Sequence, residues 1–348
     1  MEYRLFGRTG VRVSRLVLGC MNFGGRTDEA EAARIIGTAL DAGIIMLDTA
    51  NVFGHEPGDF TFGRGRSEEI VGRALRGRRD EVFLASKVHY PMGEGPNASG
   101  NSRRHIIEQC EASLRRLGTD RIDLYQLHGF DVDVPIDESL HALDDLSRRG
   151  LIRYAGASGF PAWRHVEAMW AAKEWRLRRL VSEQPPYNLL DRRIERELIR
   201  MAQTYDLAVI VWSPLAGGYL TGGYRMGVEP PVESRFGTFW REWGREHDKP
   251  EVHQVVAGLG ALAAGKGCHL ATLALAWVIH QPGVTAPIIG PRTVAHLASA
   301  LKAFDVEFTD EDRRRIDALV PPGHAVVPYY AGGAELWQSW KASALAWR

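Results

Sequence analysis

Short runs of apolar residues recur along this chain, and most of them end in a polar residue or a glycine. Most runs are followed by a stretch in which apolar residues repeat every three to four positions, the spacing typical of an amphipathic helix. We predict that each short run is a buried strand. The eight runs are LVLG from Leu16, IIMLD from Ile44, VFLASK from Val82, IDLYQLH from Ile122, IRYAGAS from Ile152, LVSEQ from Leu180, AVIVWS from Ala208 and APIIG from Ala286.

The predicted helices alternate with these strands. They cover residues 29–42, 67–78, 103–117, 138–149, 161–173, 193–205 and 294–303. Eight alternating units favour a parallel sheet closed into a barrel, because right-handed crossovers add strands on the same side until the edges meet. We therefore predict an α/β fold, a (β/α)8 TIM barrel, and expect residues 1–348 to form a single domain.

Three segments depart from this repeat. The first strand is preceded by YRLF and VRVS around Arg8-Thr9-Gly10, which predicts a β-hairpin capping one end of the barrel. After the seventh strand comes a long insert, in which residues 213–250 form a predicted cofactor or substrate loop and residues 251–264 and 271–280 two helices. The aromatic tail, residues 321–348, either folds over the barrel mouth or packs against helices or a second subunit, which leaves a homo-oligomer open.

Composition narrows the function by exclusion. The 43 basic and 43 acidic residues cancel, so nothing favours binding to nucleic acid or to an anionic membrane. The chain lacks an apolar signal core and a run long enough for a membrane helix. Its three scattered cysteines have no metal-binding spacing and suggest free thiols, hence a cytoplasmic protein without a metal. The GxGxxG, P-loop, HExxH and GxSxG motifs are also missing, which argues against the doubly wound dinucleotide fold, the P-loop enzymes and the common hydrolases. We expect the partner to be a small-molecule substrate.

Polar residues end several of the predicted strands, where TIM-barrel active sites lie. Asp48 ends the second strand, Lys87 the third and His128 the fourth. A carboxylate and an ammonium at adjacent strand ends can pair, and a partly desolvated lysine beside an imidazole suits proton transfer or the stabilisation of an oxyanion. The alternative is a structural Asp–Lys bridge with a capping histidine.

Several stretches resemble the aldo-keto reductases, in the order in which that family carries them, from Leu5 to about Phe304. They include LVLGCMNFGG, MLDTANVFG, LASKV, SLRRLGTDRIDLYQLHG, VWSPLAGGYLTGGY and PIIGPRTVAHLASAL. The resemblance implies a barrel that binds NADPH without a Rossmann fold and reduces carbonyls with a tetrad of Asp, Tyr, Lys and His. By this resemblance Asp48, Lys87 and His128 take three of the four catalytic roles.

The fourth catalytic position holds Phe53, where the family carries its tyrosine. A phenyl ring has no proton to give, and losing a positioned donor typically lowers the rate by about 10²- to 10⁴-fold. Four explanations stay open: an engineered substitution, a different donor, a substrate such as an iminium or activated enone that needs little acid catalysis, or a protein that binds cofactor and does little chemistry. The candidate replacement donors are Tyr90, His89, His55 and His128.

The resemblance also implies a set of cofactor-binding residues. Trp212 would stack on the nicotinamide, and Ser158 and Gln184 would bind its carboxamide. Arg292 would bind a 2′-phosphate together with helix N–H groups, which favours NADP over NAD. The remaining predicted cofactor-binding positions are Met21, Ser213, Leu215, Gly217, Gly218, Gly290 and His296. For the segment from Ser213 to Gly222, the alternative interpretation is a plain flexible loop.

Together these features predict an NADP-dependent oxidoreductase of aldo-keto reductase type. It would transfer hydride to a carbonyl, enone or imine carbon of a small substrate, with an atypical proton donor. The resemblance leans weakly toward members that act on sugars, including those of secondary metabolism. The alternative is a nicotinamide-binding sensor or partner subunit with little or no activity, as the potassium-channel β subunits of this superfamily illustrate.

Overall fold

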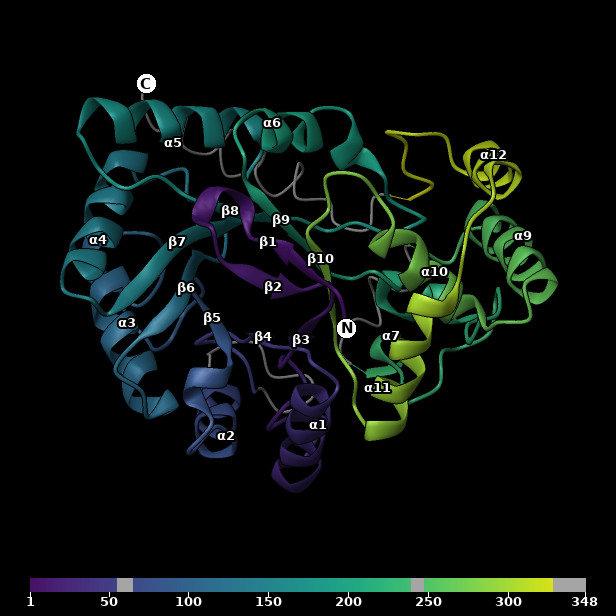
Figure 1. The fold of residues 1–348 in the computed structure, drawn as a ribbon, viewed down its shortest axis with the longest axis horizontal. Coiled ribbons are helices and arrows are strands. Elements are labelled where there is room, and N and C mark those ends of the chain that lie inside the picture. Colours follow the sequence, from purple (N-terminus) through teal and green to yellow (C-terminus); the bar gives the residue numbers. More distant parts are fainter. Residues whose placement is uncertain (55–64, 239–246, 328–348) are drawn as a thin grey trace.

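A closed barrel of eight parallel strands forms the centre of the molecule, and helices surround it (Figure 1). The computed structural model describes residues 1–54, 65–238 and 247–327. The barrel strands are β3 (Val17–Gly19), β4 (Met46–Asp48), β5 (Phe83–Val88), β6 (Ile122–Leu127), β7 (Ile152–Ser158), β8 (Ser182–Gln184), β9 (Ala208–Val211) and β10 (Ala286–Ile289). Neighbours in the chain pair in parallel and β10 closes against β3, so the predicted TIM barrel is confirmed.

The helices follow the predicted alternation closely. They are α1 (Glu29–Asp41), α2 (Arg66–Ala74), α3 (Arg103–Leu117), α4 (Ile136–Arg148), α5 (Ala162–Glu174), α6 (Leu198–Thr204), α7 (Arg235–Thr238), α9 (Pro250–Gly265), α10 (Leu270–Ile279), α11 (Val294–Leu301) and α12 (Asp310–Leu319). The predicted helix 193–205 is split into a 3₁₀ turn, η3 (Arg193–Glu195), and α6, because Glu197 between them has the non-helical angles φ −143°, ψ −49°.

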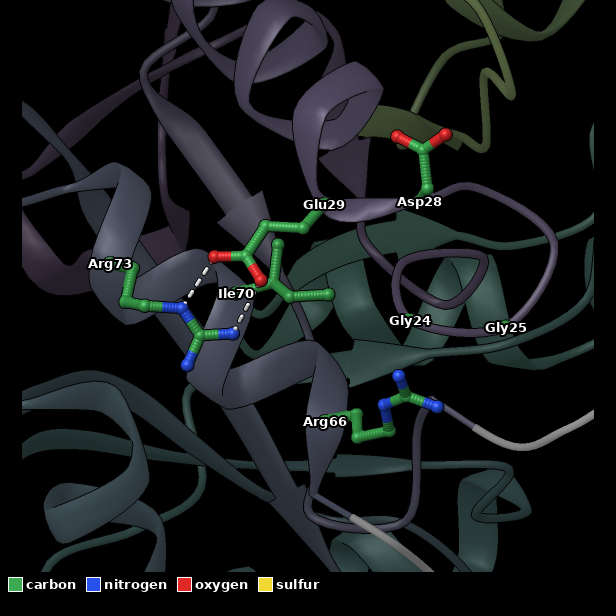
Figure 2. A pocket seen from close by; sticks show the side chains of 7 residues that line it. All are labelled: Gly24, Gly25, Asp28, Glu29, Arg66, Ile70 and Arg73. Atoms are coloured by element: carbon green, nitrogen blue, oxygen red, sulfur yellow. Dashed lines mark hydrogen bonds and ion pairs between the residues drawn. The ribbon is translucent and has the colours of Figure 1, made fainter.

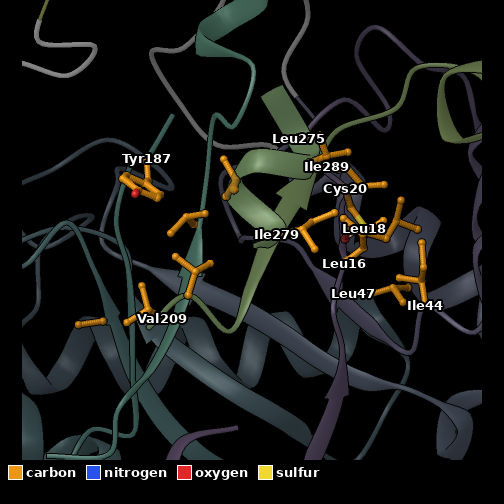
Figure 3. Packing of buried hydrophobic residues seen from close by; sticks show 14 of the residues in the cluster. Leu16, Leu18, Cys20, Ile44, Leu47, Tyr187, Val209, Leu275, Ile279 and Ile289 are labelled. Atoms are coloured by element: carbon orange, nitrogen blue, oxygen red, sulfur yellow. Dashed lines mark hydrogen bonds between the residues drawn. The ribbon is translucent and has the colours of Figure 1, made fainter. Parts of the chain in front are cut away.

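Alternation along the strands builds two apolar layers. One side chain in two points into the barrel, and this inner layer includes Val17, Met46, Phe83, Leu124 and Ile210. The intervening side chains point outward and pack under the helices. Figure 3 shows part of this outer layer, which includes Leu18 of β3, Leu47 of β4, and Leu275 and Ile279 of α10.

The N-terminal hairpin closes one end of the barrel. Strands β1 (Tyr3–Leu5) and β2 (Arg12–Ser14) pair antiparallel, as predicted, and are joined through a 3₁₀ turn, η1 (Gly7–Thr9). Between β1 and η1, Phe6 is fully buried, and its ring centroid lies 5.2 Å from that of Phe83 inside the barrel. The end of the barrel at which the strands begin is thus sealed with apolar side chains.

The long insert after β9 contains a 3₁₀ segment, η4 (Ala216–Thr221), followed by α7, α9 and α10. The two predicted helices of the insert are therefore present. Residues 239–246 of the predicted loop, residues 328–348 of the tail and the candidate donor His55 lie outside the described residues. Within the described ranges no single helix is long and apolar enough to cross a membrane, and α9 and α10 meet that criterion only as a pair bent by 90°.

Candidate active site

A buried ion pair lies where β4 and β5 end. Asp48 is the last residue of β4, and the parallel register sets it opposite Ala85, two residues before Lys87. The Lys87 ammonium lies 2.6 Å from Asp48 Oδ2 and also donates to the main-chain oxygen of Thr49 at 2.7 Å. Both charged side chains are almost fully buried. Burial lowers the pKa of Lys87, and the Asp48 carboxylate opposes that shift.

The second oxygen of Asp48 is held by amides from two further strands. Gln184 Nε2 of β8 donates to Asp48 Oδ1 at 2.9 Å, and Gln126 Nε2 of β6 donates to the same oxygen at 3.3 Å. Four strands therefore fix the orientation of one carboxylate. Gln126 was not among the predicted site residues, although its inward position two residues before His128 follows from the strand period.

Phe53 and His128 complete the group around Lys87. The Lys87 ammonium lies 4.8 Å from the centroid of the Phe53 ring, and the rings of Phe53 and His128 meet edge to face at 5.4 Å. His128 follows the last residue of β6, and burial, reinforced by the charge of Lys87, holds the pKa of His128 well below its ordinary value. Its imidazole is therefore neutral near pH 7.

Two further residues after β5 approach His128. The ring of Tyr90 meets that of His128 edge to face at 4.9 Å, and His89 packs against Tyr90 at 5.1 Å. His89 Nδ1 lies 3.0 Å from Asn101 Oδ1. A Cβ atom at Gly129 would come within 2.7 Å of the His89 ring, so this close approach requires glycine. Burial lowers the pKa of His89 as well.

The predicted nicotinamide-binding side chains form hydrogen bonds around the main-chain oxygen of Gln184. The indole N–H of Trp212 donates to this oxygen at 3.1 Å, and Ser158 Oγ donates to it at 2.8 Å. Trp212 lies one residue beyond β9, and Ser158 is the last residue of β7. A flat indole and two polar side chains thus share one wall of the barrel mouth.

The loop after Trp212 has an unusual backbone. Ser213 and Ala216 have φ values of 55° and 48°, and Gly217 and Gly218 follow with 64° and 111°. Tyr224 Oη donates to the main-chain oxygen of Gly217 at 3.2 Å. Within this turn the N–H groups of Ala216 and Gly218 donate to the main-chain oxygens of Ser213 and Leu215, each at 2.9 Å. The other N–H groups of the turn are candidates for binding an anion, and we call residues 213–218 the phosphate cradle.

Three arginines gather beside this loop. Arg26 lies between β3 and α1, Arg235 in α7 and Arg292 between β10 and α11. Burial, and then the charges of Arg292 and Arg235, lower the pKa of Arg26. Arg26 and Arg292 both donate to the main-chain oxygen of Glu233. Because this carbonyl oxygen carries no net charge, the contact does not neutralise either guanidinium. Arg26 and Arg235 were missed, because no local pattern places loops so distant in sequence together.

One cavity of about 1750 Å³ joins these groups. Pockets for drug-sized ligands usually have volumes of about 300–1,000 Å³, so this larger cavity has room for a dinucleotide and a small substrate together. The catalytic candidates Asp48, Phe53, Lys87 and His128 all line it. So do all the predicted cofactor positions: Met21, Ser158, Gln184, Trp212, Ser213, Leu215, Gly217, Gly218, Gly290, Arg292 and His296.

A second, much smaller pocket of about 240 Å³ lies between the β3–α1 loop and α2 (Figure 2). Its walls include Asp28, Glu29 and Arg73, and the guanidinium of Arg73 makes two hydrogen bonds to the Glu29 carboxylate. None of the predicted site residues lines it. In the part of the chain that the structure describes, no three His, Cys, Asp or Glu side chains are grouped so as to hold a metal ion.

The barrel and its polar mouth define a class of protein. The model of the Aldo/keto reductase family matches residues 15–321, so the chain belongs to this family. It is an oxidoreductase of the kind that reduces carbonyl groups with a nicotinamide cofactor.

Individual relatives cover nearly the whole chain. An uncharacterized oxidoreductase of Bacillus subtilis, YrpG, is 41% identical over 95% of this chain and 100% of its own. A probable voltage-gated potassium channel subunit beta of rice, Oryza sativa subsp. japonica, is 35% identical, and the match covers 92% of this chain and 97% of that protein. The L-glyceraldehyde 3-phosphate reductase of Escherichia coli K12 is 31% identical, with 93% of each chain covered.

Proposed function

We propose that this protein is an NADPH-dependent reductase that transfers hydride to a carbonyl, enone or imine carbon of a small substrate, possessing a proton donor other than residue 53. The observation that carries the proposal is the shared cavity. The Asp48–Lys87 pair, His128 and Phe53 line the same space as Trp212, the phosphate cradle and the three arginines. A sugar-like substrate or a secondary metabolite is in keeping with the family resemblance.

The residues present suit the cofactor at both of its ends. The phosphate cradle would offer main-chain N–H groups to a diphosphate, and Arg26 and Arg292 are suited to a 2′-phosphate, which NADPH has and NADH lacks. When bound there, NADPH supplies the hydride. Trp212, Ser158 and Gln184 would hold the nicotinamide ring at the barrel mouth, beside His128.

The protein's own part in the chemistry is electrostatic. The ammonium of Lys87, kept charged by Asp48, raises the positive potential at the barrel mouth, where negative charge develops on the substrate oxygen. Neutral His128 keeps one ring N–H and can donate a hydrogen bond to that oxygen without transferring the proton. Phe53 contacts both Lys87 and His128, but its apolar ring has no proton to transfer.

Tyr90 is our candidate for the proton donor. Among the replacements considered, His128 is held neutral and His89 is engaged with Asn101. Tyr90 lines the cavity, and its ring meets that of His128 edge to face at 4.9 Å. It lies three residues after Lys87 in the chain. Tyr90→Phe should lower kcat for carbonyl reduction by about 10²-fold or more and leave NADPH affinity unchanged. Unchanged kcat in steady-state assays would exclude this role.

The second candidate function is a nicotinamide-binding partner subunit with little activity. Two observations favour it, the phenyl ring of Phe53 beside Lys87 and the similarity to proteins described as potassium channel β subunits. Single-turnover mixing of NADPH-loaded protein with a panel of aldehydes, ketones, enones and imines separates the two. We expect NADPH oxidation with at least one class, and its absence with all of them would favour the partner-subunit function.

We also propose that the enzyme works in the cytoplasm. Cys20 and Cys110 are buried and Cys268 is half-buried, and all three are free thiols. Burial raises the pKa of Cys110 to about 12, so this thiol stays protonated and unreactive. Free thiols are the usual state in a reducing compartment. Fractionation of the native host, with the protein detected by antibody, tests this assignment.

A further inference from the structure

The cavity carries opposite charges at its two ends. Arg26 and Arg292 lie on the loops after β3 and β10, which are neighbours in the barrel. The loop between β6 and α4 lies across the mouth from them, because β6 is four strands away from β10 in the closed ring of eight. On this opposite loop, Asp131 and Asp133 both line the cavity. One end is thus cationic and the other acidic.

The Asp131 carboxylate is fixed by main-chain groups. Its Oδ2 accepts a hydrogen bond from the N–H of Asn101 at 2.7 Å, and its Oδ1 accepts one from the N–H of Asp133 at 3.0 Å. Neither Asp131 nor Asp133 forms an ion pair within residues 1–54, 65–238 and 247–327. Among the described residues, their negative charge therefore has no cationic partner.

Two arginines near the cavity wall already have carboxylate partners. Arg193, which also lines the cavity, forms two hydrogen bonds to the Asp191 carboxylate at 2.8 and 2.6 Å. Arg164 lies behind the wall, with its guanidinium 4.8 Å from the centroid of Phe130, and it pairs with Glu167 at 2.5 Å. Arg164 also donates to the main-chain oxygen of Val134 at 3.1 Å. Each of these two guanidiniums has its own carboxylate partner, so neither adds net positive charge to the described part of this end.

Aromatic side chains complete the same wall. Phe130 and Phe160 meet edge to face at 5.8 Å, and both line the cavity together with Tyr90. Aromatic faces bind flat apolar groups and also cations, whereas a carboxylate or phosphate placed there would face both the ring quadrupole and the aspartates. His89 and His128 are held neutral by burial and add no positive charge.

We propose that Asp131 and Asp133 determine substrate charge, so that the enzyme accepts carbonyl compounds whose far end is neutral or cationic and rejects those with a carboxylate or phosphate there. This inference rests on the proposed reductase function, because it concerns the substrate of that same cavity. At separations of several ångströms and with partial solvent screening, each carboxylate should change the affinity for a unit charge about threefold.

The test compares three aldehydes that differ in charge at the para position: 4-carboxybenzaldehyde, 4-formylbenzamide and 4-formyl-N,N,N-trimethylanilinium. Their binding to the protein–NADP⁺ complex is measured by isothermal titration calorimetry. NADP⁺ has no hydride to give, so binding is measured whether or not reduction occurs. It also occupies the arginine end, which keeps the anionic aldehyde away from that competing site.

We expect the cation to bind most tightly and the anion least tightly, with about a threefold difference or more. Asp133→Asn and Asp131→Asn should each narrow that range, and salt at about 0.5 M should do the same. Asp137→Asn is the matched control: this aspartate lies in α4, outside the cavity lining, and its variant should keep the wild-type order. Asp133 is the safer test position, because its exposed side chain fixes no loop.

Equal or tighter binding of the carboxylate by the wild-type protein overturns the proposal. The proposal is also overturned if neither aspartate variant changes the order in which the three aldehydes bind, or if the neutral and cationic aldehydes do not bind. Failure of the reductase function gives a different result. In that case the charge order is present in the NADP⁺ complex, but 4-formylbenzamide is not reduced when NADPH replaces NADP⁺.

Discussion

The same eight strands build two very different ends of the barrel. Where they begin, Phe6 of the hairpin connection seals an interior made of apolar side chains, such as Phe83 and Met46. Where they end, the interior opens into a cavity whose floor contains an ion pair, Asp48 and Lys87. The change occurs within one strand: in β5 the successive inward residues are Phe83, Ala85 and Lys87.

This comparison teaches that the two functions of a barrel strand are separated by only a few residues. Inward residues in the first half of a strand contribute to stability through apolar burial, and those in the last turn contribute charge to the cavity. Substitutions at the two ends should therefore differ in what they change. The sealed end should determine the free energy of unfolding, and the open end should determine cofactor binding and reaction rate.

The largest expected effect is at the sealed end. Phe6→Ala removes a fully buried ring that packs against Phe83, and it should lower the free energy of unfolding by about 3–5 kcal/mol. Denaturant unfolding measures this loss. Leu5→Ala is the control, because the Leu5 side chain is 52% exposed and should cost about 0.5 kcal/mol or less. A reduced NADPH affinity in folded Phe6→Ala protein would contradict the separation of the two ends.

The next effect is at the cationic side of the open end. Arg292→Ala should weaken NADPH binding by about tenfold or more and leave NADH binding nearly unchanged, because only NADPH offers a 2′-phosphate to the guanidinium. Fluorescence titration with both cofactors measures the change. Arg193→Ala removes another arginine of the cavity, one that is paired with Asp191, and should keep the wild-type preference. Equal wild-type dissociation constants for NADPH and NADH would refute this assignment.

A smaller effect, of opposite sign, is expected at Phe53. Phe53→Tyr places a phenol beside Lys87, whose charge favours the ionised form and so makes the phenol a stronger acid. Reduction of simple aldehydes should rise by at least about tenfold in steady-state assays. Phe130→Tyr, which adds a phenol elsewhere in the cavity lining, should give no such gain. If both variants behave alike, Phe53 does not stand at the proton-donating position.

The smallest effect concerns pH. Folded His128 has a lowered pKa, whereas in the unfolded chain it binds a proton below about 6.5. The unfolded state then holds more protons, so stability should fall as the pH drops below about 6.5. His128→Asn should remove up to about 1.4 kcal/mol per pH unit of this dependence. Denaturant unfolding between about pH 5 and 7 measures it, and parallel curves for both proteins would mean that His128 titrates normally.

Much of this organisation is readable from the sequence, because it depends on local periodicity. The eight strands follow from short apolar runs, and Asp48, Lys87 and His128 follow from their places at strand ends. No range was predicted for helix α12, although Thr309 and Asp312 form a capping box at its start. The contacts of Arg26 with Glu233 and of Asp131 with Asn101 join distant loops. Such pairings depend on how the loops fold over the barrel mouth, which no local pattern specifies.

The central claim is that the open end transfers hydride from NADPH to a substrate carbon despite the phenyl ring at position 53. The most direct test loads the protein with NADPH carrying deuterium at C4 of the nicotinamide and mixes it with the carbonyl, enone and imine panel in a single turnover. Mass spectrometry of the products then locates the label. The account predicts deuterium on the carbon that was reduced, at a yield approaching one per bound cofactor. Bound NADPH that leaves no deuterium on any compound of the panel would contradict it.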